Sequence, residues 1–94
     1  MKPKVEMRIG TCVVVLMIRP EQLAICDEKD NYTDWSDSYP EDSLERKCFG
    51  LARAKKAFVS QVYAEITKVR FYFKFWSEED ANSFCKELEK VCNT

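Results

Sequence analysis

The sequence predicts a single small α+β domain over residues 1–94, in which an antiparallel sheet of three to four strands carries two helices packed on one face. Three observations predict this class. Two strand-like apolar runs open the chain, a long stretch with helical spacing of apolar residues follows, and a sharply alternating strand then leads into a second helical stretch. The elements therefore follow the order ββαβα.

The N-terminal residues predict a β-hairpin. Residues 4–9 (KVEMRI) alternate charged and apolar side chains, as a half-buried strand does, and Gly10 ends the run. Residues 12–18 (CVVVLMI) are all apolar and mostly β-branched, which is typical of a central strand covered on both faces. Pro20 favours a turn, and residues 22–26 (QLAIC) are expected to return as an antiparallel strand.

The middle of the chain predicts one long helix over residues 43–66. Asp42 followed by Glu45 fits a capping box at its start. Apolar residues then recur at helical spacing, and they are Leu44, Cys48, Leu51, Ala54, Phe58 and Val62. Gly50 is the one residue that disfavours this helix.

The C-terminal part predicts a strand followed by a helix. Residues 68–76 (KVRFYFKFW) place four apolar residues on one face, namely Val69, Phe71, Phe73 and Phe75. Ser77, with Asp80 three residues later, has the pattern of a capping box that starts the second helix. No repeat, linker or low-complexity tract interrupts this order.

The composition excludes several chemistries. The chain contains no histidine, so the catalytic triads and metal sites that use histidine cannot form. Its two glycines, Gly10 and Gly50, are too far apart to build a phosphate-binding loop. The five cysteines have no metal-binding spacing, and their odd count favours free thiols in a reducing cytoplasm. We therefore expect a cytoplasmic protein that is not an enzyme and has no cofactor, no metal site and no membrane span.

Charge is divided unevenly along the chain. Residues 27–42 (DEKDNYTDWSDSYPED) hold seven carboxylates and one lysine, a net charge of −6, whereas the whole chain has a net charge of −1. The rest of the chain therefore sums to +5. An EF-hand calcium loop starting at Asp30 does not fit, because Tyr32 and Trp35 stand where a ligand and a glycine are needed.

The acidic segment, residues 30–42, is therefore interpreted as a contact surface for a protein with a basic surface. Tryptophan and tyrosine are enriched at interface hot spots, and surrounding carboxylates speed encounter with a basic partner. The residues expected to bind are Asp30, Tyr32, Asp34, Trp35, Asp37, Tyr39 and Glu41. Such a chain suits an inhibitor or adaptor, for example a viral or phage accessory protein that blocks a host nucleic-acid-binding factor by imitating phosphates. The alternative is that the segment is only a polar connection with Trp35 folded onto the sheet.

A second candidate surface is the other face of strand 68–76. It alternates cations and aromatics, which suits phosphate contact and base stacking, and its residues are Lys68, Arg70, Tyr72, Lys74 and Trp76. Residues 68–84 (KVRFYFKFWSEEDANSF) resemble the third strand and following helix of an RNA-recognition motif, with Lys68 in the basic place and Tyr72 in a stacking place. The sequence departs from that motif where Val69 replaces a glycine and Arg70 an aromatic. The resemblance implies a nucleic-acid-binding module as the alternative function.

Two further hypotheses concern the long helix and the strand edge. The basic residues of the helix form either a solvated face or a landing site for the acidic segment, and they are Arg46, Lys47, Arg53, Lys55 and Lys56. A homodimer is also possible, in which strand 68–76 is an open edge that pairs with its own copy.

Overall fold

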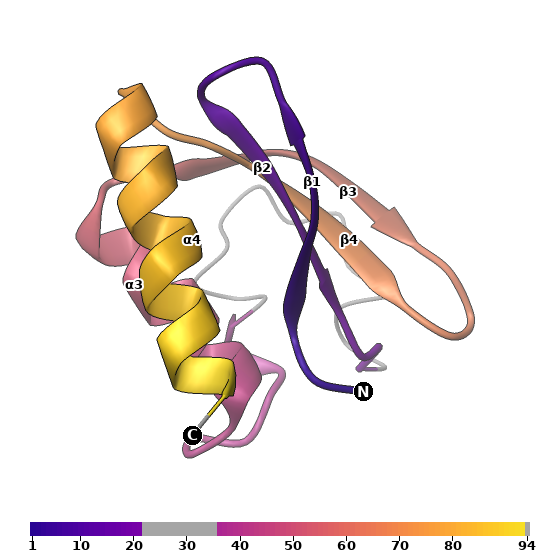
Figure 1. Cartoon of the computed structure of the whole chain (residues 1–94). Coiled ribbons are helices and arrows are strands. Elements are labelled where there is room, and N and C mark those ends of the chain that lie inside the picture. The colour runs from indigo at the N-terminus through magenta and orange to yellow at the C-terminus, as the bar shows by residue number, and fades with distance from the viewer. Residues whose placement is uncertain (22–35, 94) are drawn as a thin grey trace.

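The computed structural model describes residues 1–21 and 36–93. Within these ranges it contains the strands β1 (Lys4–Ile9), β2 (Val13–Ile18), β3 (Phe58–Ala64) and β4 (Val69–Lys74), and the helices α3 (Leu44–Ala54) and α4 (Glu78–Cys92). The strands form one antiparallel sheet in the order β1-β2-β4-β3. Both helices cover the same face of this sheet (Figure 1). The predicted fold class is confirmed, and the predicted return strand over residues 22–26 lies outside the described residues.

The inner face of the sheet, which the helices cover, carries the core. The alternation predicted for residues 68–76 is confirmed, since Val69, Phe71, Phe73 and Phe75 are all buried. Phe49 of α3 packs edge-on against Phe71 at a ring distance of 5.0 Å, and Phe84 of α4 lies 5.0 Å from Phe75. These aromatic rings, together with Val14, Leu16 and Ile18 of β2, therefore join the sheet to the two helices in one core.

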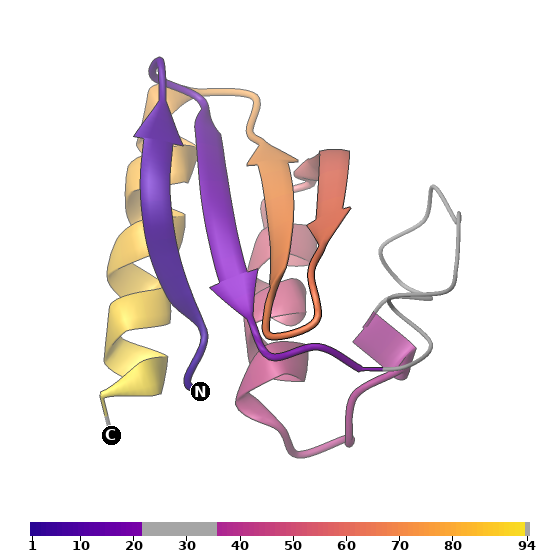
Figure 2. The same cartoon turned by 90° about the vertical axis from the view of Figure 1, so that its right-hand side faces the viewer.

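The outer face of the sheet has no helix over it among the described residues (Figure 2). The ladders place Met7 and Ile9 of β1, Tyr72 of β4 and Tyr63 of β3 on this face. Val15 is only 1% exposed there, because it lies between Met7 and Tyr72 in the ladder. On the outer face, the large side chains of Met7 and Tyr72 therefore shield the smaller side chain of Val15 from solvent.

The single long helix predicted over residues 43–66 is wrong. The helix α3 ends at Ala54, and residues 58–64 form the edge strand β3. The helix closes with Lys56 in the left-handed region (φ 57°), where the Lys56 amide donates to the Arg53 carbonyl and the Ala57 amide donates to the Ala52 carbonyl. This pair of bonds is the Schellman arrangement that commonly ends a helix.

The predicted caps are confirmed at one helix and corrected at the other. Ser77 accepts a hydrogen bond from the Asp80 amide and begins α4 as expected. In α3 the capping side chain is Ser43, which accepts from the Arg46 amide at 3.2 Å, and not Asp42. Asp42 is exposed and lies one residue before the capping Ser43.

Candidate functional site

The structure describes only the C-terminal part of the acidic segment. Of the seven residues expected to bind a partner, Asp37 and Glu41 are exposed, and Tyr39 is buried at 2% exposure. The other four lie outside the described residues, and they are Asp30, Tyr32, Asp34 and Trp35. Tyr39 therefore belongs to the core rather than to an exposed contact surface.

Tyr39 connects the C-terminal part of the acidic segment to Arg19, which lies before the segment. Its hydroxyl donates a hydrogen bond of 2.9 Å to the carbonyl of Arg19, and the Arg19 guanidinium lies 5.3 Å from the centre of the Tyr39 ring. The ring also lies 6.1 Å from Phe49 in the core. Burial, followed by the negative charge of Glu45, raises the pKa of Tyr39 above its ordinary range.

Arg46 fixes the same region from α3. Its Nε donates to the carbonyls of Ser36 and Tyr39 at 3.1 Å each, and its guanidinium lies 3.3 Å from the Asp37 carboxylate. We name Arg19, Ser36, Tyr39 and Arg46 the Tyr39 clamp. The basic residues of the helix were predicted to face either solvent or the acidic segment, and Arg46 contacts that segment. Lys55 instead pairs with Glu87 of α4 at 3.0 Å.

The predicted nucleic-acid-binding residues do share the outer face, but their charges are partly matched. Arg70 Nε lies 2.7 Å from the carboxylate of Glu6, and its Nη1 lies 3.1 Å from Glu65. The hydrogen bond from Arg70 lowers the pKa of Glu6, and the same bond raises the pKa of Arg70. Lys68 also lies near Glu65, at 3.9 Å. This part of the face is therefore a mixed-charge network rather than a basic strip.

Aromatic side chains dominate the rest of the outer face. Trp76 is 72% exposed and lies 6.0 Å from Phe58, while Tyr63 packs edge-on against Tyr72 at 5.5 Å. Lys74 lies 6.0 Å from the Phe58 ring centre. Sequence reasoning missed Phe58 and Tyr63, because it placed both on a helix. Their β-branched and aromatic surroundings (FVSQVYA) were the available signal.

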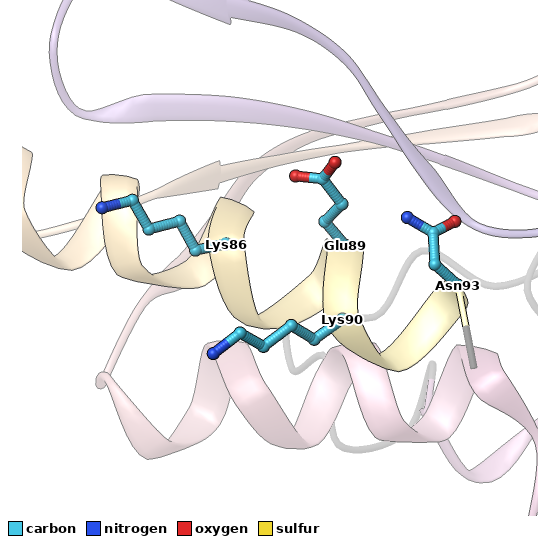
Figure 3. A pocket seen from close by; sticks show the side chains of 4 residues that line it. All are labelled: Lys86, Glu89, Lys90 and Asn93. Carbon is cyan, nitrogen blue, oxygen red and sulfur yellow. The ribbon is translucent and has the colours of Figure 1, made fainter.

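Two of the surface hollows lie along α4. The larger, about 630 Å³, is bounded by Lys86, Glu89, Lys90 and Asn93, whose side chains extend from the helix into the open (Figure 3). A second hollow of about 290 Å³ lies between the N-terminal strand and α4 and reaches Cys85 and Cys92. Among the described residues, the charged groups lining the larger hollow are Lys86, Glu89 and Lys90, and those lining the second are Lys4 and Glu89.

The cysteines do not form a reactive centre in the parts of the chain that the structure describes. Cys48 is fully buried and hydrogen-bonded to Cys92, and burial raises the pKa of both thiols. A thiol whose pKa is raised is a poor nucleophile, because the thiolate is the reactive form. Within residues 1–21 and 36–93, no three histidine, cysteine, aspartate or glutamate side chains are grouped as a metal site requires.

In the part of the chain that the structure describes, no helix combines the length and the apolar content that a membrane span requires. Comparisons with protein-family models, with curated proteins and with solved structures found no match to this chain.

Proposed function

We propose that this chain is a non-enzymatic binding protein that engages a protein with a basic surface through residues 30–42. The Tyr39 clamp is the observation that carries this proposal. A plain polar connection needs no such anchorage, whereas here the C-terminal part of the segment is bonded to Arg19, which lies before it, and to Arg46 of α3. Binding loops are commonly held in this way by a rigid scaffold.

The charge distribution supports a basic partner. The net charge of −6 in residues 27–42 attracts a positive surface and speeds association. A protein that normally binds nucleic acid is a suitable target, because carboxylates spread along a segment can occupy its phosphate-binding positions. The protein would then act in the cytoplasm as an inhibitor or adaptor, in the manner of a viral or phage accessory protein.

The residues of the acidic segment have different roles in this proposal. Trp35 and Tyr32 supply the apolar anchor, since buried aromatics account for much of the binding energy at interfaces. Carboxylates pair with basic groups of the partner, and these are Asp30, Asp34, Asp37 and Glu41. Tyr39 acts indirectly, because its buried ring and bonded hydroxyl position the segment without reaching the partner.

The test uses two variants matched in chemistry. The segment variant carries Asp34→Asn, Trp35→Ala and Asp37→Asn, and the control variant carries Trp76→Ala, Glu79→Gln and Glu89→Gln, so each loses one tryptophan and two negative charges. Proteins captured from a native host by the wild type are identified by mass spectrometry and then titrated against all three. We expect the segment variant to bind about 30-fold or more weakly, as loss of a hot-spot residue does.

The control variant should bind like the wild type. Equal affinity of the segment variant and the wild type would show that residues 30–42 are only a connection. Loss of binding by the control variant alone would instead assign the contact to the region around Trp76 on the outer face.

A second candidate function is nucleic-acid binding through the outer face. The ring pairs Phe58–Trp76 and Tyr63–Tyr72, with Lys74 beside them, favour it as a stacking platform. The ion pairs of Arg70 with Glu6 and Glu65 weigh against it, because they neutralise a cation that the phosphates would need.

A further inference from the structure

The strand β3 is an edge strand of unusual composition. It hydrogen-bonds to β4 on one side, and among the described residues no strand lies on its other side. Its sequence, FVSQVYA, contains no charged residue, whereas β1 at the opposite edge (KVEMRI) contains three. Natural proteins usually protect an edge strand with charges, because its unpaired backbone groups can pair with another strand. The edge at β1 has this protection and the edge at β3 does not.

Large apolar side chains of β3 are exposed on the surface. Phe58 is 42% exposed and Tyr63 is 50% exposed on the outer face. Val59 and Val62, on the inner face, are only half-buried against the edge of the core. Ile66, just beyond the end of the strand, is 94% exposed. Apolar groups therefore line β3 on both faces of the sheet.

The strand β3 contains a bulge. The register of β3 against β4 shifts between Val59 and Gln61, and the Ser60 hydroxyl donates to the Tyr72 carbonyl at 3.1 Å. The irregularity is thus satisfied within the β3–β4 pair. It also places Phe58, Gln61 and Tyr63 together on the outer face, so that the two aromatic rings lie toward opposite ends of the strand.

We propose that β3 pairs with β3 of a second copy of this chain, antiparallel across a two-fold axis, so that two four-stranded sheets join into one. A second copy fits because the strand is neutral and meets itself without repulsion between like charges. Antiparallel pairing also brings the Phe58 end of one strand beside the Tyr63 end of the other, and cross-strand aromatic pairs stabilise a sheet. Strand 68–76, the edge expected from the sequence, cannot serve, because β4 lies between β2 and β3.

The experiment compares Tyr63→Lys with Met7→Lys by sedimentation equilibrium over a wide range of protein concentration. The two positions are matched, since Tyr63 is 50% and Met7 is 49% exposed on the same outer face, one in β3 and the other in β1. We expect the wild type and Met7→Lys to reach twice the chain mass of 11.0 kDa, and Tyr63→Lys to remain at 11.0 kDa. Far-UV circular dichroism verifies that each variant is folded.

Amide hydrogen exchange then locates the interface. Pairing through β3 should slow exchange of β3 amides at high concentration relative to low concentration, with no change in β1. A monomeric wild type at every concentration would overturn self-pairing and leave the β3 edge to a strand of another protein. Dissociation of Met7→Lys, or protection in β1 rather than β3, would overturn it as well. This interface does not use residues 30–42, so its failure leaves the proposed function untouched.

Discussion

The hydroxyl of Tyr39 donates to the carbonyl of Arg19 at 2.9 Å, across twenty residues of sequence. The two residues stand on either side of segment 22–35, so this one bond closes the chain around most of the acidic segment. The Arg19 side chain strengthens the closure, because it pairs with Glu21 and lies 3.3 Å from the buried carboxylate of Glu45 in α3. The anchorage of the segment therefore combines the buried side chains of Tyr39 and Glu45 with two partly exposed arginines.

Replacement of Tyr39 by Phe tests this closure. The ring stays in the core while the Arg19 carbonyl loses its donor, so the free energy of unfolding should fall by about 1 kcal/mol, measured by urea denaturation. Tyr63→Phe is the control, because Tyr63 is half exposed and its change should stay within about 0.5 kcal/mol. Equal losses in the two variants would mean that the Tyr39 bond adds nothing specific. Tyr39→Phe should also bind the partner more weakly than Tyr63→Phe does.

The sequence predicted the sheet, the inner face of β4 and the start of α4, because strict alternation and a capping serine are strong local signals. It failed at β3 for a physical reason. The bulge between Val59 and Gln61 puts Phe58 and Tyr63 on one face and Val59 and Val62 on the other. Apolar spacings of three, four and five residues result, and these imitate a helix. The exposed aromatic residues of this edge could not be placed until this strand was known.

The end of α3 could not be predicted either, because the local sequence gives no signal for it. A helix usually ends at glycine in the left-handed region, but here that position is Lys56, within a run (ARAKKA) of good helix formers. Tertiary contacts hold Lys56 there, since the Trp76 indole donates to the Lys56 carbonyl at 2.7 Å.

The candidate binding site was less predictable. The expectation that residues before Asp37 bind a partner is based on the composition of the sequence alone. The burial of Tyr39 had no local signal, because it depends on Arg19 and Phe49.

Lys56→Gly should therefore stabilise the protein. The left-handed conformation costs a non-glycine residue about 1–2 kcal/mol, while glycine adds about 0.5–1 kcal/mol of entropy to the unfolded chain. The expected net gain is up to about 1 kcal/mol, measured by urea denaturation. Lys47→Gly, within α3, should have the opposite sign and cost about 1 kcal/mol. A destabilised Lys56→Gly would mean that the lysine side chain makes a contribution larger than its backbone strain.

The Glu6–Arg70 pair predicts a pH dependence of stability. The hydrogen bond from Arg70 lowers the pKa of Glu6 below its ordinary value of 4.5, so the folded state binds this proton less readily than the unfolded state. The contribution of the pair is therefore present above about pH 4.5 and is lost as the pH falls through the lowered pKa. Glu6→Gln should make the fall of Tm with acid shallower in this window, as measured by circular dichroism. A Tm of Glu6→Gln that falls with acid as steeply as that of the wild type would contradict this contribution.

The same ion pairs give an unusual expectation for nucleic-acid binding. If the outer face binds single strands, Lys68→Ala and Lys74→Ala should each weaken retention on an oligonucleotide resin and lower the salt slope by about 0.7 for each phosphate that is no longer neutralised. Glu6→Gln should strengthen retention, because it frees part of the Arg70 charge that Glu6 now matches. Lys86→Ala, on the far side of the molecule on α4, is the matched control for removal of one lysine. A wild type that is not retained at low salt would exclude this function and leave the outer face to contacts with protein.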